Sequence, residues 1–161
     1  MSSDNTRDIE RAWELMKKIG FAMLVTHDGD KLRARPMAAY VDRAADAVYF
    51  LSDARRHKDD EIRQNPNVNL SFADAGDQKY VSVSGTVSVS NDRAKIKELF
   101  TTAAKAWWDN ADDPNIRVLK FAPDEAEFWD SPGTVISYVK MATAAMTGSR
   151  PDIGTNRKVA I

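Results

Sequence analysis

Residues 78–90 read QKYVSVSGTVSVS, and this stretch carries the clearest pattern in the sequence. Valines alternate with serines and a threonine, which is the period-two pattern of a strand with two different faces. Gly85 falls on the valine face, where the missing side chain predicts a bend or a close approach of another backbone. A long alternating strand with a central glycine is typical of a curved barrel rather than a flat sheet.

Shorter elements are predicted on both sides of this strand. Apolar or alternating runs indicate further strands at residues 21–26, 32–41, 47–52, 68–72, 116–121, 126–129 and 135–139. Amphipathic patterns indicate helices at residues 5–19, 55–64 and 92–108. Short strands with helices at the margins predict a single α+β domain over residues 1–161, built on a mostly antiparallel barrel. Residues 1–20 form its N-terminal helical segment, and residues 141–161 are expected to be an extended tail.

The overall composition is that of a globular protein of one domain. The chain has 161 residues, of which 43% are hydrophobic, enough for a packed core. Its 23 basic and 24 acidic residues give a formal charge of −1. A protein that grips nucleic acid through phosphate contacts is normally basic, so the composition argues against a nucleic-acid partner.

The absence of cysteine excludes disulfides, thiolate metal sites and a cysteine nucleophile. The two histidines are far apart in sequence, and no paired metal-ligand motif accompanies them, so no metal site is expected. The polar first eight residues do not resemble a signal peptide, and no apolar run approaches a membrane span. We therefore expect a cytoplasmic protein without a membrane partner.

Residues 32–37, LRARPM, are the first candidate binding segment. Strand alternation places Arg33, Arg35 and Met37 on one face. Two arginines on a half-buried strand need an anionic partner, because an unpaired buried charge is costly. Pro36 cannot donate a ladder hydrogen bond, so this strand is expected either to be an edge strand or to be interrupted at Pro36. The alternative, which residue types alone favour, is a solvated face with its charges in water.

Residues 52–58, SDARRHK, are the second candidate. Three cations and a histidine fall in the predicted first turn of a helix, where the helix dipole favours negative charge. This arrangement is unfavourable unless an anion binds, and free amides with converging cations suit a phosphate monoester. Ser52 would add a hydroxyl donor. The alternative is a basic surface patch offset by the acidic residues 59–61, and the two interpretations have equal weight.

The tryptophans are the third feature. An indole ring can stack on a flat cofactor, and its N–H can donate a hydrogen bond. Trp107 continues the apolar stripe of the predicted helix 92–108 and is expected in the core. Trp108 lies off that stripe, so a place at an interface and a place in a pocket wall both remain alternatives for it. Residue type alone leaves Trp129 undecided between core and binding site.

At this point the sequence resembles a known family, the FMN-binding split barrels related to pyridoxamine 5'-phosphate oxidase. The closest branch is that of general stress protein 26. The resemblance rests on an ordered set of segments: FAMLVTHDGD, LRARPM, VYFLSD, HKDDEIRQNPNVNLSFAD, YVSVSGTV, DRAKIKELF and AEFWDSP. The family implies a homodimer with two FMN sites at the subunit interface.

The resemblance also implies roles for individual residues. It assigns flavin contacts to Arg33, Arg35, Pro36 and Met37, phosphate contacts to Ser52 and Lys58, and an approach to the partner's flavin to Trp129. Tyr80 stands where the oxidase has a glutamine that contacts FMN. Arg56 stands where this branch commonly has serine, which leaves open whether it replaces the phosphate contact or points away.

The function expected from this resemblance is that of an FMN-dependent oxidoreductase, with a nicotinamide cofactor as a possible electron donor. The oxidase has an arginine and a histidine near its C-terminus that bind the pyridoxal substrate, and residues 130–136, DSPGTVI, contain neither. Oxidation of pyridoxamine phosphate is therefore not expected. No side chain stands out as an acid or base, so no catalytic residue is assigned. One alternative is a flavin carrier or sensor with little turnover. A second, which the near-neutral charge disfavours, is a nucleic-acid-binding barrel.

Overall fold

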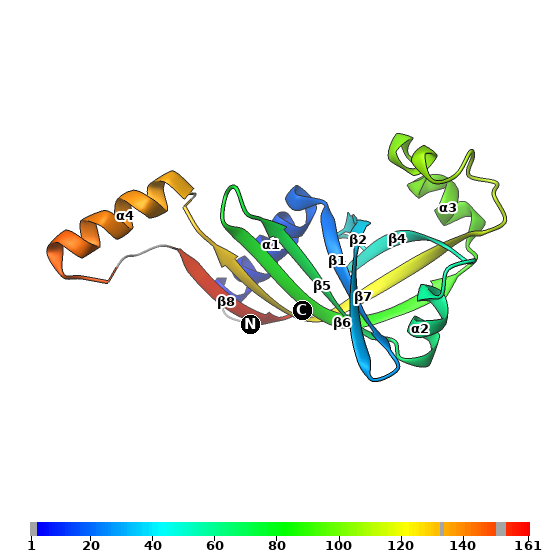
Figure 1. Cartoon of the computed structure of the whole chain (residues 1–161), viewed down its shortest axis with the longest axis horizontal. Coiled ribbons are helices and arrows are strands. Elements are labelled where there is room, and N and C mark those ends of the chain that lie inside the picture. Colours follow the sequence, from blue (N-terminus) through cyan, green and yellow to red (C-terminus); the bar gives the residue numbers. More distant parts are fainter. Residues whose placement is uncertain (1–2, 133, 151–153) are drawn as a thin grey trace.

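A computed structural model describes residues 3–132, 134–150 and 154–161 of the chain (Figure 1). The helices are α1 (Ser3–Ile19), α2 (Lys58–Gln64), α3 (Arg93–Leu99), the 3-10 helix η1 (Thr102–Ala106) and α4 (Thr134–Thr147). The strands are β1 (Phe21–Asp28), β2 (Lys31–Ala38), β3 (Tyr40–Asp42), β4 (Ala47–Asp53), β5 (Asn67–Asp74), β6 (Lys79–Ser90), β7 (Ile116–Asp130) and β8 (Thr155–Ala160).

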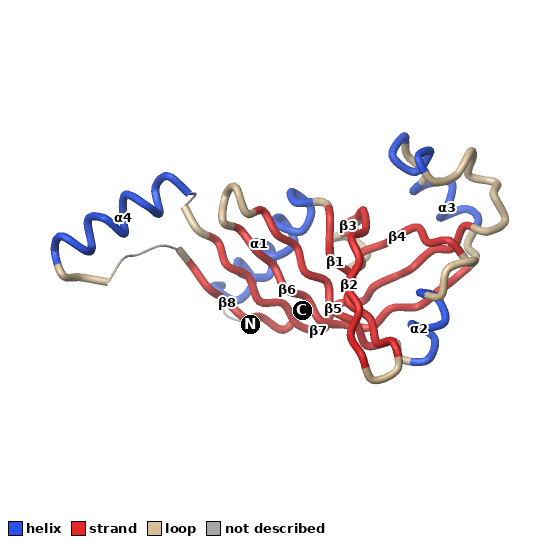
Figure 2. The backbone as a smooth tube through the Cα atoms, in the orientation of Figure 1, coloured by secondary structure: helices blue, strands red, loops and turns tan. Residues whose placement is uncertain are grey.

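All eight strands belong to one antiparallel sheet with the order β2-β1-β5-β6-β7-β4-β3, and β8 also pairs with β7. Strands β2 and β3 are separated only by Ala39, yet they lie at opposite ends of this order. The sheet must therefore curl until its two edges approach each other without pairing (Figure 2). This is an α+β split barrel, as the sequence predicted, and its sheet is not closed.

Two apolar clusters lie on opposite faces of the sheet. The larger one, on the inner face, joins Trp13, Leu15 and Met16 of α1 to buried residues of the strands. The smaller one joins Ile96 of α3 and Trp108 to the other face of β4. Six of the seven residues of β4 are buried because this strand has a cluster on each side. The last residues of this strand, Leu51, Ser52 and Asp53, line a cavity.

Strand β6 has the predicted alternation, with Val81, Val83 and Val87 buried, Val89 partly buried and the serines turned outward. Gly85 lies on the buried face, at a register shift between β6 and β7. A Cβ atom at this position would lie 2.2 Å from the carbonyl oxygen of Ala122 and 2.9 Å from the Cα atom of Pro123. The prediction of a close backbone approach at Gly85 is confirmed, and the irregularity bends the two longest strands.

Three predicted boundaries are wrong. Strand 32–41 is interrupted at Ala39, and strands 116–121 and 126–129 are one strand, β7. Pro123 is tolerated inside β7 because it lies at the register shift, where no regular ladder bond is needed. The predicted helix 92–108 is split, since Phe100 adopts an extended conformation between α3 and η1.

The C-terminal region also differs from its prediction. The strand expected at residues 135–139 belongs to α4, because a short apolar run does not by itself distinguish a strand from a helix. The tail expected to be extended from residue 141 completes this helix and then forms β8. Helix α4 projects from one end of the molecule (Figure 1). Among the described residues, no helix combines the length and the apolar character that a membrane crossing requires.

Candidate functional site

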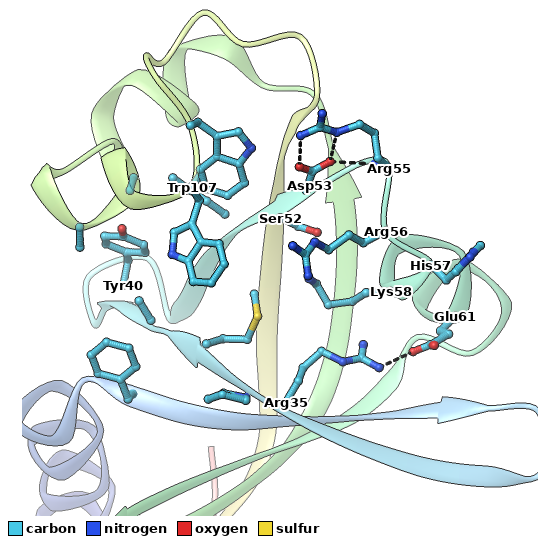
Figure 3. Close-up of a pocket in the computed structure, with 18 of the residues that line it drawn as sticks. Arg35, Tyr40, Ser52, Asp53, Arg55, Arg56, His57, Lys58, Glu61 and Trp107 are labelled. Atoms are coloured by element: carbon cyan, nitrogen blue, oxygen red, sulfur yellow. Dashed lines mark hydrogen bonds and ion pairs between the residues drawn. The ribbon is translucent and has the colours of Figure 1, made fainter.

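A cavity of about 810 Å³ lies in the split of the barrel, where the β2 edge approaches the end of β4 (Figure 3). The start of α2 and the α3–η1 region complete its walls. Its charged and polar lining consists of Arg33, Arg35, Tyr40, Ser52, Asp53, Arg55, Arg56, His57, Lys58 and Glu61. Its apolar lining consists of Phe21, Pro36, Met37, Ala38, Leu51, Ala103, Ala104, Trp107 and Trp108. Five cations face two carboxylates, so the cavity suits an anion.

Six of the seven site residues expected from the sequence line this cavity: Arg33, Arg35, Pro36, Met37, Ser52 and Lys58. Pairing of β1 with β2 places Arg33 opposite Thr26 and Arg35 opposite Leu24, on the inner face of the sheet. Strand β2 is an edge strand, as Pro36 predicted. Trp129 is the exception and does not reach the cavity of its own subunit.

Lys58 is the most deeply buried cation of the cavity. Its exposed fraction is 8%, and burial lowers the pKa of its amine. The nearby charges of Arg35 and Arg56 lower this pKa further, against the opposing effect of Asp59. Within the described part of the chain, the amine of Lys58 has no hydrogen-bond or ion-pair partner. An ammonium group in this setting is stabilised by an anion that enters the cavity.

Arg56 points into the cavity next to Lys58 and Ser52 (Figure 3). Its guanidinium likewise has no acidic partner among the residues that the structure describes. The sequence left open whether this side chain faces the site or points away, and in the structure it faces the site. Arg56 and Lys58 together offer several N–H donors to one ligand group, the arrangement that binds a phosphate.

Arg55 has a different role from its neighbour. It forms a bidentate pair with Asp53, with N–O distances of 2.6 and 2.9 Å. The hydrogen bonds from Arg55 lower the pKa of Asp53 to about 2, against the opposing effect of burial. Asp53 therefore stays ionised and pairs with the guanidinium of Arg55. This pairing leaves Arg55 less available to an incoming anion.

The predicted helix start at residue 55 is wrong, because α2 begins at Lys58. Its first turn contains acidic residues, Asp59, Asp60 and Glu61, which are favourable near the positive end of the helix dipole. Arg55 and Arg56 lie in the preceding loop. The unfavourable helix start inferred from the sequence does not exist, and the cationic character of the cavity comes from side chains.

Ser52 is buried at the end of β4, and its hydroxyl donates a hydrogen bond of 2.7 Å to Oδ1 of Asp59. A hydroxyl has one proton, so in this state Ser52 is not the free donor that the sequence suggested. The bond ties β4 to α2. It thereby fixes the position of Lys58, which precedes Asp59 in the chain.

Glu61 is a site residue that sequence reasoning missed. Its buried carboxylate accepts hydrogen bonds from Thr26 Oγ1 at 2.8 Å and Arg35 Nη2 at 2.9 Å. Burial alone would raise the pKa of Glu61, but these bonds and the charges of Arg35 and Arg33 lower it overall. The available signal was helical spacing, which puts Glu61 on the same face of α2 as Lys58. In the sequence, Glu61 figures only among the acidic residues 59–61 that offset the cations in the surface-patch alternative.

The opposite side of the cavity is apolar and aromatic. Trp108 is 8% exposed and belongs to the smaller apolar cluster, which joins α3 to β4, whereas Trp107 is 70% exposed. The expectation that Trp107 is a core residue is wrong, because the helical stripe on which it rested ends at residue 99. Trp107 and Tyr40 face the cations across the cavity (Figure 3). One side thus suits an anionic group and the other a flat ring.

Trp129 lies on the outer face of the sheet, opposite Tyr80 of β6. The two rings are 38% and 37% exposed. Two half-exposed aromatic rings side by side are typical of a surface that another molecule covers.

The fold and the cavity define a split-barrel protein with a cationic ligand site between its sheet edges. The chain belongs to the pyridoxamine 5'-phosphate oxidase-like family, whose sequence profile matches residues 7–152. General stress protein 26 of Bacillus subtilis is 26% identical over 129 residues, covering 75% of this chain and 88% of the relative.

Solved structures agree with this assignment. A Jannaschia sp. CCS1 protein assigned to general stress protein 26 superposes with a TM-score of 0.80 and 25% identity, covering 98% of this chain and 99% of that one. The general stress FMN/FAD binding protein of Xanthomonas citri superposes with a TM-score of 0.66 and 24% identity, covering 74% and 86%. This second likeness concerns the fold alone.

Proposed function

We propose that this protein binds FMN in the cationic cavity and acts as an FMN-dependent oxidoreductase of the general stress protein type. The observation that carries the proposal is the pair Arg56 and Lys58, which face the cavity and have no acidic partner among the described residues. A phosphate monoester carries up to two negative charges and three acceptor oxygens, which these donors match. A protein of the same fold, that of Xanthomonas citri, is named as an FMN/FAD binding protein.

The proposed division of the cavity follows its chemistry. Lys58 and Arg56 hold the phosphate, and Ser52 holds α2 in place through Asp59. Arg35, Pro36 and Met37 of β2 contact the flavin, with Arg33 at the rim, and the aromatic side excludes water from it. When bound, FMN supplies the hydride and electron chemistry that no side chain of this cavity provides.

We further propose a homodimer in which Trp129 reaches the cavity of the other subunit. Met23, Tyr80 and Trp129 are all partly exposed on the outer face of the sheet, where the register of β1, β5, β6 and β7 lines up small polar residues between them. Helices α1 and α2 contribute to the inner cluster, and α3 and η1 to the cluster over β4. This part of the outer face is therefore available to a second copy.

The reaction is proposed to differ from that of pyridoxamine phosphate oxidase. The segment after Trp129 lacks the arginine and histidine expected for a pyridoxal substrate. Its first residue, Asp130, is already paired with Arg11 at 2.6 Å and with Lys79 at 2.7 Å. A nicotinamide cofactor is the proposed electron donor.

The visible spectrum of the purified protein, with the released chromophore identified by mass, tests the binding proposal. We expect a yellow protein that releases FMN, and a colourless protein that ignores added FMN would contradict the proposal. Steady-state oxidation of NADH or NADPH with an electron acceptor then tests the activity. Binding without turnover would favour the flavin carrier, and turnover of pyridoxamine phosphate would contradict the proposed reaction class.

A further inference from the structure

We infer that Glu61 is a positioning residue, which holds Arg35 so that one of its amino groups stays free to bind the ligand. This inference rests on the proposed FMN site and deepens it. Its basis is the short chain of contacts from Thr26 through Glu61 to Arg35, together with one buried donor at the end of that chain.

The unsatisfied donor is Nη1 of Arg35. The Arg35 side chain is 20% exposed, and its Nη2 donates to Glu61 at 2.9 Å. Its Nη1 is buried and has no hydrogen-bond partner in the described structure. Buried donors in native proteins are nearly always satisfied, and an exception at a site is often satisfied by a ligand. Because Arg35 lines the cavity, a bound ligand is the candidate partner for Nη1.

Glu61 is built to hold Arg35 in place. Its side chain is 8% exposed, and it contacts a second arginine, Arg33, at 3.5 Å. Thr26, which is fully buried in β1, donates to the same carboxylate oxygen that Arg35 contacts. Three elements, β1, β2 and α2, therefore meet at this carboxylate. A guanidinium held at one amino group loses little further freedom when the other binds a ligand.

The negative charge of Glu61 has an effect on FMN binding opposite to that of a positioning role. A carboxylate beside an anion site repels the anion, so on charge alone its removal would tighten FMN binding. A positioning role predicts the reverse, because Arg35 would lose its orientation. Thr26→Val separates the two effects, since it removes the hydrogen bond to Glu61 without changing any charge.

The experiment is a set of FMN titrations followed by flavin fluorescence. We expect Thr26→Val and Glu61→Gln each to raise the Kd for FMN by about five- to tenfold, the effect of losing one well-placed hydrogen bond. Thr26→Ser keeps the hydroxyl and should restore the wild-type Kd. Asp60→Asn is the matched control, because it removes a carboxylate from the same helix at a residue that does not line the cavity. It should leave the Kd unchanged.

A double-mutant comparison identifies Arg35 as the residue through which Glu61 acts. Arg35→Ala should weaken FMN binding by about tenfold or more. In that background, Glu61→Gln should cause no further weakening. Independent weakening in both backgrounds would overturn the inference, and so would tighter binding by Glu61→Gln alone. Circular dichroism of each variant, with thermal melting, verifies that a changed Kd does not reflect an unfolded protein.

The outcomes also separate this inference from the proposed function. If the wild type binds FMN and Thr26→Val and Glu61→Gln bind it equally well, Glu61 has no positioning role and the FMN site stands. If the wild type does not bind FMN at all, the proposed function is wrong and the inference falls with it.

Discussion

At the scale of single residues, the cations of the cavity divide into paired and unpaired groups. Arg55 is held by Asp53, and Arg33 and Arg35 share Glu61. Within the described chain, Lys58 and Arg56 have no such partner. Lys58 and Arg56 are therefore the two cations proposed to bind the phosphate of the ligand.

Lys58→Ala should weaken FMN binding by about 1.5–3 kcal/mol, the range for hydrogen bonds to charged groups. Flavin fluorescence titration measures the change. Lys97→Ala is the matched control, because Lys97 is exposed, lies 3.7 Å from Asp112 and does not line the cavity. Equal affinities of wild type and Lys58→Ala would refute the assignment of Lys58 to the phosphate.

Asp53 gives a pH-dependent prediction. Its pKa is lowered to about 2 by Arg55, so the stability that its ionised form provides is present above the unfolded pKa of about 3.9. That stability is lost as the pH falls from about 4 towards 2. Because Arg55 is 64% exposed, solvent screening keeps this gain small.

The comparison that isolates Asp53 uses Asp53→Asn in urea unfolding at pH 6 and at pH 2.5. We expect the wild type to be more stable than the variant at pH 6, with the difference shrinking at pH 2.5. The pKa values of Glu61 and Asp130 are also lowered by their hydrogen-bond partners, but these two groups are present in both proteins. A difference that is the same at both pH values would contradict the Asp53–Arg55 pairing.

Most of the candidate site was predictable at the residue scale. Strand alternation placed Arg33, Arg35 and Met37 correctly on one face, and the run of cations after β4 lies on the cationic side of the cavity. Hydrogen-bond partners were not predictable, since Glu61 meets Thr26 only after β1 and α2 pack together. For the same reason the sequence could not tell that Asp59 engages the hydroxyl of Ser52.

At the scale of the elements, prediction worked where the pattern was long. The alternation of β6 identified both its faces and its special glycine. Prediction failed for α4, because the short apolar run at residues 135–139 fits a strand as well as a helix. It also failed for α3 and η1, because one apolar stripe continues across residues 100 and 101, where the helix is interrupted. Local propensity does not encode the packing of Trp108 against β4, which accompanies that break.

Gly85→Ala tests the bend in the longest strand pair. The added methyl would overlap the backbone of Ala122 and Pro123 and the ring of Phe121, which is buried in the core. We expect a loss of unfolding free energy of about 2 kcal/mol or more, as for overpacked cores. Gly76→Ala is the control, because its Cβ atom would meet only a side-chain oxygen of Asp74 at 3.5 Å. Equal melting curves for wild type and Gly85→Ala would contradict the close approach.

For the molecule as a whole, the notable uncovered feature is the outer-face pair of Tyr80 and Trp129, whose rings are half-exposed. The cavity is lined by residues of β2, β4, α2 and the η1 region, whereas Trp129 lies near the C-terminal end of β7, where this strand pairs with β8. That end of β7 is the one next to α4 (Figure 1). A single subunit cannot bring Trp129 to its own cavity in this arrangement. The proposed homodimer resolves the mismatch by supplying the tryptophan from the second copy.

Ser82→Arg tests the proposed interface. Ser82 lies in the middle of the outer face, opposite Ser71 on one side and Glu127 on the other. A long charged side chain there should separate the subunits, because its desolvation in the interface is costly even beside Glu127, and its bulk does not fit where a serine stands. Size-exclusion chromatography with light scattering should give a dimer for the wild type and a monomer for Ser82→Arg. Gln64→Arg, an exposed position on α2, is the control and should stay dimeric.

A monomeric wild type at micromolar concentration would refute the dimer and leave the cavity without the aromatic group proposed for it. A dimer that Ser82→Arg leaves intact would place the interface elsewhere on the molecule.

FMN and riboflavin, titrated in parallel into the wild-type protein, show whether the cavity recognises the phosphate of the ligand. The two ligands share the flavin ring and the ribityl chain and differ only in the phosphate. If Arg56 and Lys58, the unpaired cations that follow the C-terminal end of β4, bind that phosphate, FMN should bind at least about tenfold more tightly than riboflavin. Equal affinities would contradict the account.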